Sequence, residues 1–287
     1  MAIARQKTTQ KDFNIGLIIL PVTIFLVVVY FMGPILWQVL TSFKVNADIS
    51  AVPNVYIPRQ ITFDHYLSLF RRRPFTLYIL NSAFVSISST LLCLAFGAPA
   101  AYALARLRLW GEKIILASVM IVTLFPGVLL FLGLLEIVKA LNLGNNYLAL
   151  IIPYTAINLP LTILVMRSFF QQLPKDLEDA AKIDGYNTFQ MLWKIILPIT
   201  LPALITTGIL TFICAWNEFI FALTFITRES MKTIPVATAQ LSGASMFEIP
   251  YGPIAAATVL GTLPLVLLVL AFQRRIVQGL TAGAVKG

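Results

Sequence analysis

Six long stretches of the chain contain no Asp, Glu, Lys or Arg, and short charged segments separate them. They are Phe13–Phe43, Pro74–Ala105, Ile114–Leu135, Ala140–Met166, Ile195–Asn217 and Ile249–Gln273. The fifth stretch continues past Glu218 to Thr227. One helical crossing of a bilayer needs roughly 20 apolar residues, so each stretch is long enough for one crossing and too short for two. Because the stretches are continuously apolar and do not alternate as barrel strands do, the pattern predicts six transmembrane helices.

Composition agrees with a membrane protein. Of the 287 residues, 59% are hydrophobic and only 11% are charged, whereas a soluble domain carries about 25% charged residues. These values exclude a soluble globular enzyme, a disordered chain and a secreted disulfide scaffold. The net charge of +9 is scattered over short segments, and nucleic-acid binding needs basic residues gathered on one hydrated face. We therefore expect no nucleic-acid partner.

Lysine and arginine residues predict the orientation. The amino-terminal segment, the second and fourth loops and the carboxyl-terminal tail hold 13 of the 21, and the other three loops hold 8. This bias predicts that both termini are cytoplasmic. Arg71, Arg72 and Arg73 oppose it, and we interpret them as a solvated collar in preference to a substrate site. The expected organisation is a cytoplasmic segment over residues 1–13, a six-helix domain over 14–275 and a cytoplasmic tail over 276–287.

The fourth loop, residues 167–194, carries the densest acidic run. Leu173–Gly185 is typical of a short helix, with Pro174 in its first turn, acidic residues near its start and Gly185 as a left-handed stop. One narrow face of this helix would combine small side chains with one acid, namely Leu177, Ala180, Ala181 and Asp184. The residues alone leave two interpretations open, an interfacial linker and a docking element for a cytoplasmic partner.

The spacing around this helix resembles a known signature. Asp179-Ala180-Ala181, then Gly185 after three residues, then Ile195-x-Leu197-Pro198 after nine more, is similar to the EAA loop of bacterial ABC importer permeases. The family pattern begins with Glu, and this chain has Asp179 there. In that family the helix fits a cleft on the ATP-hydrolysing subunit. The resemblance therefore implies coupling roles for Glu178, Asp179, Ala180, Ala181, Asp184 and Gly185.

Three further segments resemble the carbohydrate, maltose-type branch of these permeases. Ala100–Arg106 is similar to the branch's AaYAlaR segment, Ala215–Phe219 to its AWNEF segment and Gly279–Gly287 to its GLTAGAVKG tail. The resemblance implies the fold of a type I ABC importer permease. It also implies that the tail reaches the ATPase through Gly283 and Lys286.

Glu218 is the only acid well inside a predicted span. An ionised carboxylate there costs at least a few kcal/mol unless it is paired or faces water. Its neighbours Trp216 and Asn217 can stack and hydrogen-bond, which suits the apolar faces and hydroxyls of a sugar. These three residues are candidates for the substrate pathway. The alternative is an interhelical hydrogen-bond knot that holds the fifth span in place.

No residue pattern indicates catalysis. His65 is the single histidine, and we expect it at the surface of the first loop beside Asp64. The sequence lacks HExxH, CxxC and GxxxxGK[ST], so we expect no enzyme activity, no metal and no bound cofactor. ATP and Mg²⁺ would be used by a separate ATPase. An ion-coupled secondary transporter is the alternative, and it would need midplane ionisable residues and internal repeats.

The sequence thus predicts an all-α integral membrane protein of the bacterial inner membrane. By resemblance it is a permease subunit that forms half of an alternating-access pathway for a sugar or sugar derivative. The expected partners are a second permease subunit in a heterodimer, two copies of an ABC ATPase, an extracytoplasmic sugar-binding protein and the lipid bilayer. The residues do not indicate which sugar is carried.

Overall fold

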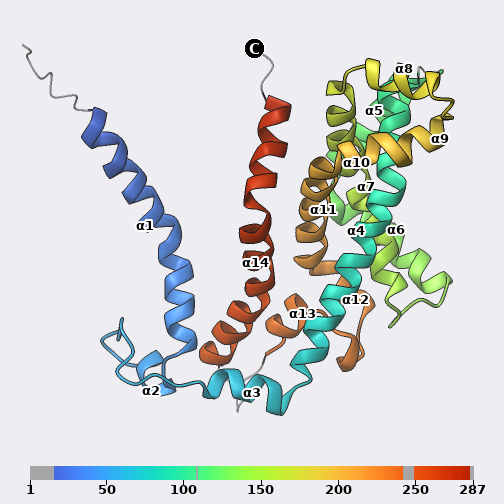
Figure 1. Ribbon diagram of the computed structural model, residues 1–287. Coiled ribbons are helices and arrows are strands. Elements are labelled where there is room, and N and C mark those ends of the chain that lie inside the picture. The colour runs from blue at the N-terminus through green and yellow to red at the C-terminus, as the bar shows by residue number, and fades with distance from the viewer. Residues whose placement is uncertain (1–15, 108, 242–248, 285–287) are drawn as a thin grey trace, which may run out of the picture.

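The computed structural model describes residues 16–107, 109–241 and 249–284. Within these ranges the chain is helical, apart from its connections and one antiparallel bridge between Lys44 and Ile61. Four helices are long and apolar enough to cross a bilayer unaided (Figure 1): α1 (Gly16–Ser42), α4 (Phe75–Arg106), α7 (Leu148–Gln172) and α14 (Tyr251–Ala284). They correspond to the first, second, fourth and sixth predicted spans.

The third predicted span is a bent pair of helices, α5 (Glu112–Leu124) and α6 (Gly127–Ala140). The two axes meet at 95°. The break lies at Phe125 and Pro126, where Phe125 is extended with ψ of 133°. A proline disfavours helical geometry in the residue before it, so the bend follows from the local sequence.

The fifth predicted span is also bent. A helical segment runs through α9 (Thr188–Met191), the π-turn η1 (Leu192–Ile196) and α10 (Leu197–Ile199), and turns by 80° into α11 (Leu201–Trp216). The bend lies between Pro198 and Pro202, each of which removes a backbone donor from the helix. The described chain therefore has four continuous candidate spans, or up to six if each bent pair is one span, and the count of six stays a prediction.

Shorter helices lie in the connections. They are α2 (Asn46–Ile49), α3 (Asp64–Arg72), α8 (Asp176–Ile183), α12 (Ile220–Phe225), the 3₁₀ turn η2 (Glu229–Met231) and α13 (Ile234–Ala239). The prediction that His65 lies at the surface is wrong, because the residue is only 7% exposed and its Nε2 lies 2.7 Å from the carbonyl of Lys44. Amphipathic α3 turns His65 and Leu69 inward, while Arg71 and Arg72 stay exposed.

Helices α4, α7 and α11 pack together as the centre of the molecule. At Gly97 of α4 an added Cβ would lie 2.6 Å from Cγ2 of Thr162 on α7. A side chain at position 97 would therefore push the two helices apart. Small residues at such crossings are common where membrane helices approach closely.

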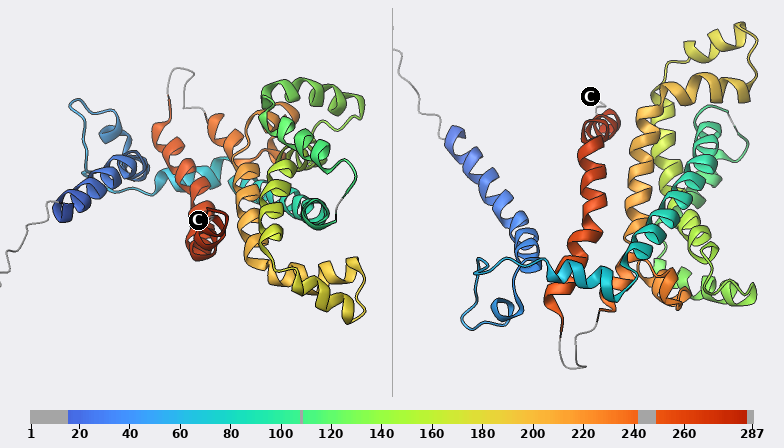
Figure 2. Two further views of the ribbon diagram at one scale, coloured as in Figure 1. Left: turned by 90° about the horizontal axis from the view of Figure 1, so that it is seen from above. Right: turned by 60° about the horizontal axis from the view of Figure 1, so that its bottom comes forward.

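Helix α1 stands apart from this centre and contacts the rest chiefly through α14 (Figures 1 and 2). None of its apolar 18-residue window is buried. The start of α1 and the end of α14 lie at the same end of the molecule as α8, whereas α2, α3 and α13 lie at the opposite end. We name these the α8 end and the α3 end.

The predicted boundary between membrane domain and tail does not coincide with a structural break. Helix α14 continues through residue 275 to Ala284, so the first part of the expected tail extends the last span. The backbone of Gly283 belongs to this helix. Lys286 and the predicted segment 1–13 lie outside the described residues.

Candidate functional site

Helix α8 forms in the loop where the sequence predicted a helix. It begins at Asp176, two residues after the expected Pro174, and three acidic residues occupy its first turn. Gly185 has φ of +82°, and the amide of Tyr186 reaches back to the carbonyl of Ala181 at 3.0 Å. This left-handed ending satisfies the last carbonyls of the helix and confirms the predicted stop at Gly185.

The faces of α8 differ from the prediction. Ala181 is only 1% exposed and packs into a cluster of buried side chains from α4, α7 and η1. Ala180 and Asp184 are exposed, so the expected single face is divided between the interior and the surface. The cause is that α8 folds back against its own membrane domain. Side chains of this same chain therefore cover Ala181, where the sequence predicted that a partner would pack.

Glu178 is also held within the chain. Its Oε1 lies 3.1 Å from Nε of Arg106, and the two side chains are 13% and 7% exposed. Arg106 is the last residue of α4 and also donates to the carbonyl of Leu173, just before α8. Glu178 is therefore already paired with Arg106 of the same chain, and its coupling role stays a prediction.

A second ion pair braces the same end. Nη2 of Arg167 on α7 lies 3.0 Å from Oε1 of Glu112, the first residue of α5. The Nε of Arg167 donates to the carbonyl of Leu104 at 3.2 Å. Together the two arginines connect α4, α5, α7 and α8, so the position of α8 is tied to the ends of three helices.

The outward surface of α8 carries Asp179, Ala180 and Ile183. Asp179 pairs with Lys182 at 3.3 Å, and both side chains are more than half exposed. Ile183 is 87% exposed, although it is a large hydrophobic residue. The sequence prediction missed Ile183. The available signal was that this residue is apolar although it lies outside the face that was expected to be covered.

The connection after Gly185 is ordered by a capping box. The side chain of Asn187 accepts from the amide of Gln190 at 2.8 Å, and the side chain of Gln190 accepts from the amide of Asn187 at 3.2 Å. This pair starts α9 and fixes the direction of the chain into the fifth span. Two apolar residues of this connection differ in their burial, since Leu192 is buried and Phe189 is 70% exposed.

Trp216, Asn217 and Glu218 do not form one polar site. The buried Trp216 donates from Nε1 to the carbonyl of Gly261 on α14 at 3.0 Å. Asn217 is exposed, and its Nδ2 donates back to Ile213 at 2.9 Å. The three residues lie at the end of α11, not within a continuous span as expected.

Glu218 lies in the break between α11 and α12 and accepts hydrogen bonds there. Its carboxylate accepts hydrogen bonds from the amides of Phe221 at 2.9 Å and Ala222 at 3.2 Å, and from the hydroxyl of Tyr154 on α7. These bonds satisfy the first amides of α12 and fasten that helix to α7. The structure thus matches the hydrogen-bond knot, the alternative that the sequence left open.

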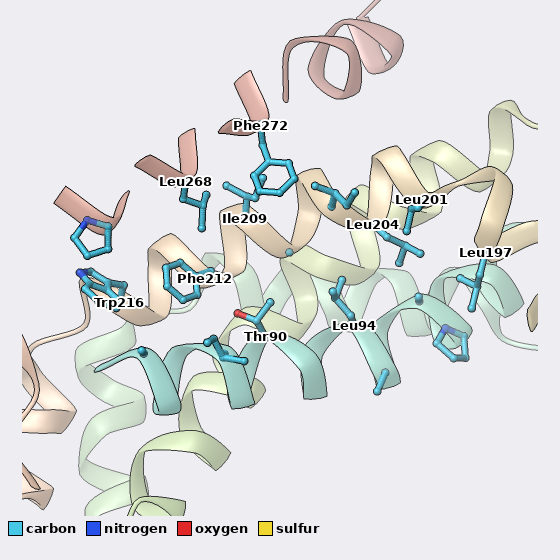
Figure 3. A pocket seen from close by; sticks show the side chains of 18 of the residues that line it. Thr90, Leu94, Leu197, Leu201, Leu204, Ile209, Phe212, Trp216, Leu268 and Phe272 are labelled. Atoms are coloured by element: carbon cyan, nitrogen blue, oxygen red, sulfur yellow. The ribbon is translucent and has the colours of Figure 1, made fainter. Parts of the chain in front are cut away.

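A cavity of about 720 Å³ lies between α4, α11 and α14 (Figure 3). Trp216 and Phe212 lie at one end of it, and Leu197 and Leu201 at the other. Most of its lining side chains are aliphatic or aromatic. Of the three predicted pathway residues, only Trp216 lines this cavity, and the apolar lining offers few partners for sugar hydroxyls.

The fold and the loop geometry define a polytopic membrane protein whose loop helix α8 is braced against its own spans. Residues 94–282 match the family of binding-protein-dependent transport system inner membrane components. The chain belongs to this family. The predicted permease class and inner-membrane location are therefore confirmed, and the family favours an importer over an ion-coupled secondary transporter.

Relatives along nearly the whole chain agree. The sulfoquinovosyl glycerol transport permease SmoH of Agrobacterium fabrum is 41% identical, covering 88% of each chain. The trehalose transport permease SugB of Mycobacterium tuberculosis is 40% identical, covering 91% of this chain and 95% of its own. The trehalose/maltose permease MalG of Thermococcus litoralis is 38% identical, covering 94% and 97%.

A solved structure shows the same fold. The chain resembles a subunit of a bacterial ABC transporter involved in the import of the acidic polysaccharide alginate, with a TM-score of 0.77 and 23% identity. The match covers 94% of this chain and 99% of that one. The predicted likeness to importer permeases is therefore confirmed at the level of the fold.

Proposed function

We propose that this chain imports a carbohydrate as one half of a permease pair, with α8 as the element that receives force from an ABC ATPase. The carbohydrate cargo is supported by three relatives, which are permeases for sulfoquinovosyl glycerol, for trehalose, and for trehalose and maltose. The proposed partners are a second permease in a heterodimer, two ATPase copies that use ATP and Mg²⁺, and an extracytoplasmic binding protein. The charge bias of the loops supports a cytoplasmic α8 end.

The division of α8 into two faces is the observation that carries this proposal. The inner face is fixed by Ala181 and by the Arg106–Glu178 pair. The outer face presents Asp179, Ala180 and Ile183 to the surroundings. A helix with one anchored side and one free side can transmit a push from a docked subunit to the membrane helices.

The end of α14 is a second proposed contact with the ATPase. The helix carries its backbone through Gly283 to the α8 end. Two segments that are well separated in the sequence, α8 and the end of α14, therefore approach the same side. We propose that the ATPase contacts both, and that Lys286 adds a positive charge beyond α14.

Replacing Gly185 by valine tests the coupling role. No atom lies within 4 Å of a Cβ built at Gly185, so the change acts through its positive φ, which a β-branched residue resists. We expect reconstituted complexes to hydrolyse ATP while losing most binding-protein-dependent uptake of trehalose. The matched control is Gly144→Val, which also has open space around the added Cβ.

Uptake that stays at the wild-type rate in Gly185→Val would contradict the coupling role.

The identity of the transported substrate is tested separately, with wild-type complexes in vesicles. We expect ATP-driven uptake of at least one neutral sugar among trehalose, maltose and glucose. Vesicles that take up none of the three, with an active ATPase and a matched binding protein, would contradict the carbohydrate assignment.

A further inference from the structure

A small polar cavity lies at the α3 end, remote from α8 and from the apolar cavity. It has a volume of about 200 Å³ and lies where the end of α1, helix α2 and the start of α14 meet. Its lining includes Trp37, Thr41, Lys44, Asp48 and Tyr251. An indole, a phenol, a hydroxyl, an ammonium and a carboxylate thus surround one space.

The charges of this cavity are buried and balanced. Lys44 is only 1% exposed, and its Nζ donates to the carbonyl of Val55 at 2.6 Å and lies 3.9 Å from the centroid of the Trp37 ring. Asp48 is 6% exposed, and its Oδ2 accepts from the amide of Arg59 at 2.9 Å. An ammonium has three donors and a carboxylate about four acceptor sites, so both groups retain hydrogen-bonding capacity.

Thr41 adds a second, independent observation. The residue is 9% exposed, and its Oγ1 is buried without a hydrogen-bond partner among the described residues. A buried hydroxyl that lacks a partner costs free energy. A ligand hydroxyl in the cavity would remove that cost.

The combination of groups indicates the class of ligand. One positive and one negative side chain leave the lining without net charge, which disfavours an ion. Donors and acceptors at several points suit a molecule with several hydroxyls, and the aromatic rings suit its apolar face. We propose that this cavity binds one neutral sugar ring, as a site at the outer mouth of the permease.

The inference deepens the proposed carbohydrate import and rests on it for the outward orientation of the α3 end. A sugar held there would meet the chain before it reaches the membrane spans. The chemistry of the lining itself does not depend on the cargo. Binding and transport can therefore be measured apart.

Fluorescence titration of the purified complex with D-glucose tests the site, because Trp37 lines it. We expect a saturable change in the wild type whose Trp37 component disappears in Trp37→Phe. Thr41→Val keeps the shape and removes the hydroxyl, and it should raise the half-saturating glucose concentration at least fivefold. Thr123→Val is the matched control, since Thr123 is exposed on α5 and bonds its own helix at Val119.

Charged analogues test the balance of the lining. D-Glucuronate and D-glucosamine keep the ring and add one charge of either sign, so each should bind at least fivefold more weakly than D-glucose. The absence of a Trp37-dependent fluorescence change would overturn the proposal. A half-saturating glucose concentration that is unaltered in Thr41→Val, or tighter binding of a charged analogue than of D-glucose, would also overturn it. Parallel uptake assays separate the two claims: uptake without a Trp37 response refutes this site alone, and a response without uptake refutes the proposed import.

Discussion

The Arg106–Glu178 pair determines how α8 sits on the membrane domain. Both side chains are mostly buried, and Arg106 also binds the carbonyl of Leu173. Removing one member of a buried pair leaves an uncompensated charge, which costs about 3–5 kcal/mol. The contact is therefore essential to the position of α8, even if a well-packed apolar pair would be equally stable.

Arg106→Met should lower the unfolding free energy of the chain by about 3 kcal/mol, because Glu178 would be left buried and unpaired. Thermal unfolding of the purified protein measures this effect. The matched control is Lys182→Met, which breaks the exposed pair with Asp179 on the same helix and should cost less than about 1 kcal/mol. The double variant Arg106→Met with Glu178→Met should recover part of the loss. Equal effects of the two single variants would contradict the anchoring role.

At the scale of elements, the turn η2 is fastened to α4 by polar contacts. Nδ2 of Asn81 donates to the carbonyls of Ser230 at 2.9 Å and Lys232 at 3.0 Å. The carboxylate of Glu229 accepts from Tyr78 and Lys232, and lies 3.6 Å from Arg73. We call these contacts, from Arg73, Tyr78 and Asn81 to Glu229, Ser230 and Lys232, the latch. Arg73 therefore contributes to the latch as well as to the solvated collar.

The latch should depend on pH through Glu229. Hydrogen bonds to its carboxylate hold the pKa of Glu229 below its ordinary value of 4.5, and the bond from Lys232 has a larger effect than the bond from Tyr78. Because the folded form binds the proton less readily, the stabilisation is complete above that ordinary value and is lost as the pH falls through the lower folded pKa. We expect Glu229→Gln to lower the Tm at pH 7 and to differ little from the wild type once Glu229 is protonated. A Tm difference that persists unchanged through acid titration would contradict this, and the exposed Glu136→Gln is the control.

Local chemistry explains which elements were predictable. The continuous apolar runs predicted α1, α4, α7 and α14 because length and composition alone determine a spanning helix. The positive φ of Gly185 followed from its place after a helix. The size of the bends was not predicted. Pro126, Pro198 and Pro202 favour a kink, and only packing decides how far the chain turns there.

The site was less predictable, because it depends on contacts between distant segments. Glu178 and Arg106 lie 72 positions apart, and only the fold brings them together. Glu218 was identified as an unusual acid, but its partner Tyr154 comes from another helix. The burial of Ala181 could not be predicted from the sequence. Helical periodicity shows which residues share a face, but it does not show what packs against that face.

At the scale of the whole molecule, the described chain leaves two apolar surfaces uncovered. Helix α1 leaves its apolar window uncovered by this chain, and α8 exposes the apolar Ile183. Lipid can cover α1, but Ile183 lies on a connection between helices. A partner at the α8 end, such as the proposed ATPase, would bury this side chain.

Site-directed cross-linking tests the central claim that the outer face of α8 contacts the ATPase while its inner face contacts the chain itself. The native Cys93 and Cys214 are first replaced by alanine, and single cysteines are placed at Ala180, Ala181 or Ile183 of the reconstituted complex. We expect cross-links to the ATPase from positions 180 and 183, increased by ATP, and none from the buried position 181. Cross-linking from position 181 alone, or from none of the three in a complex that transports, would contradict this claim.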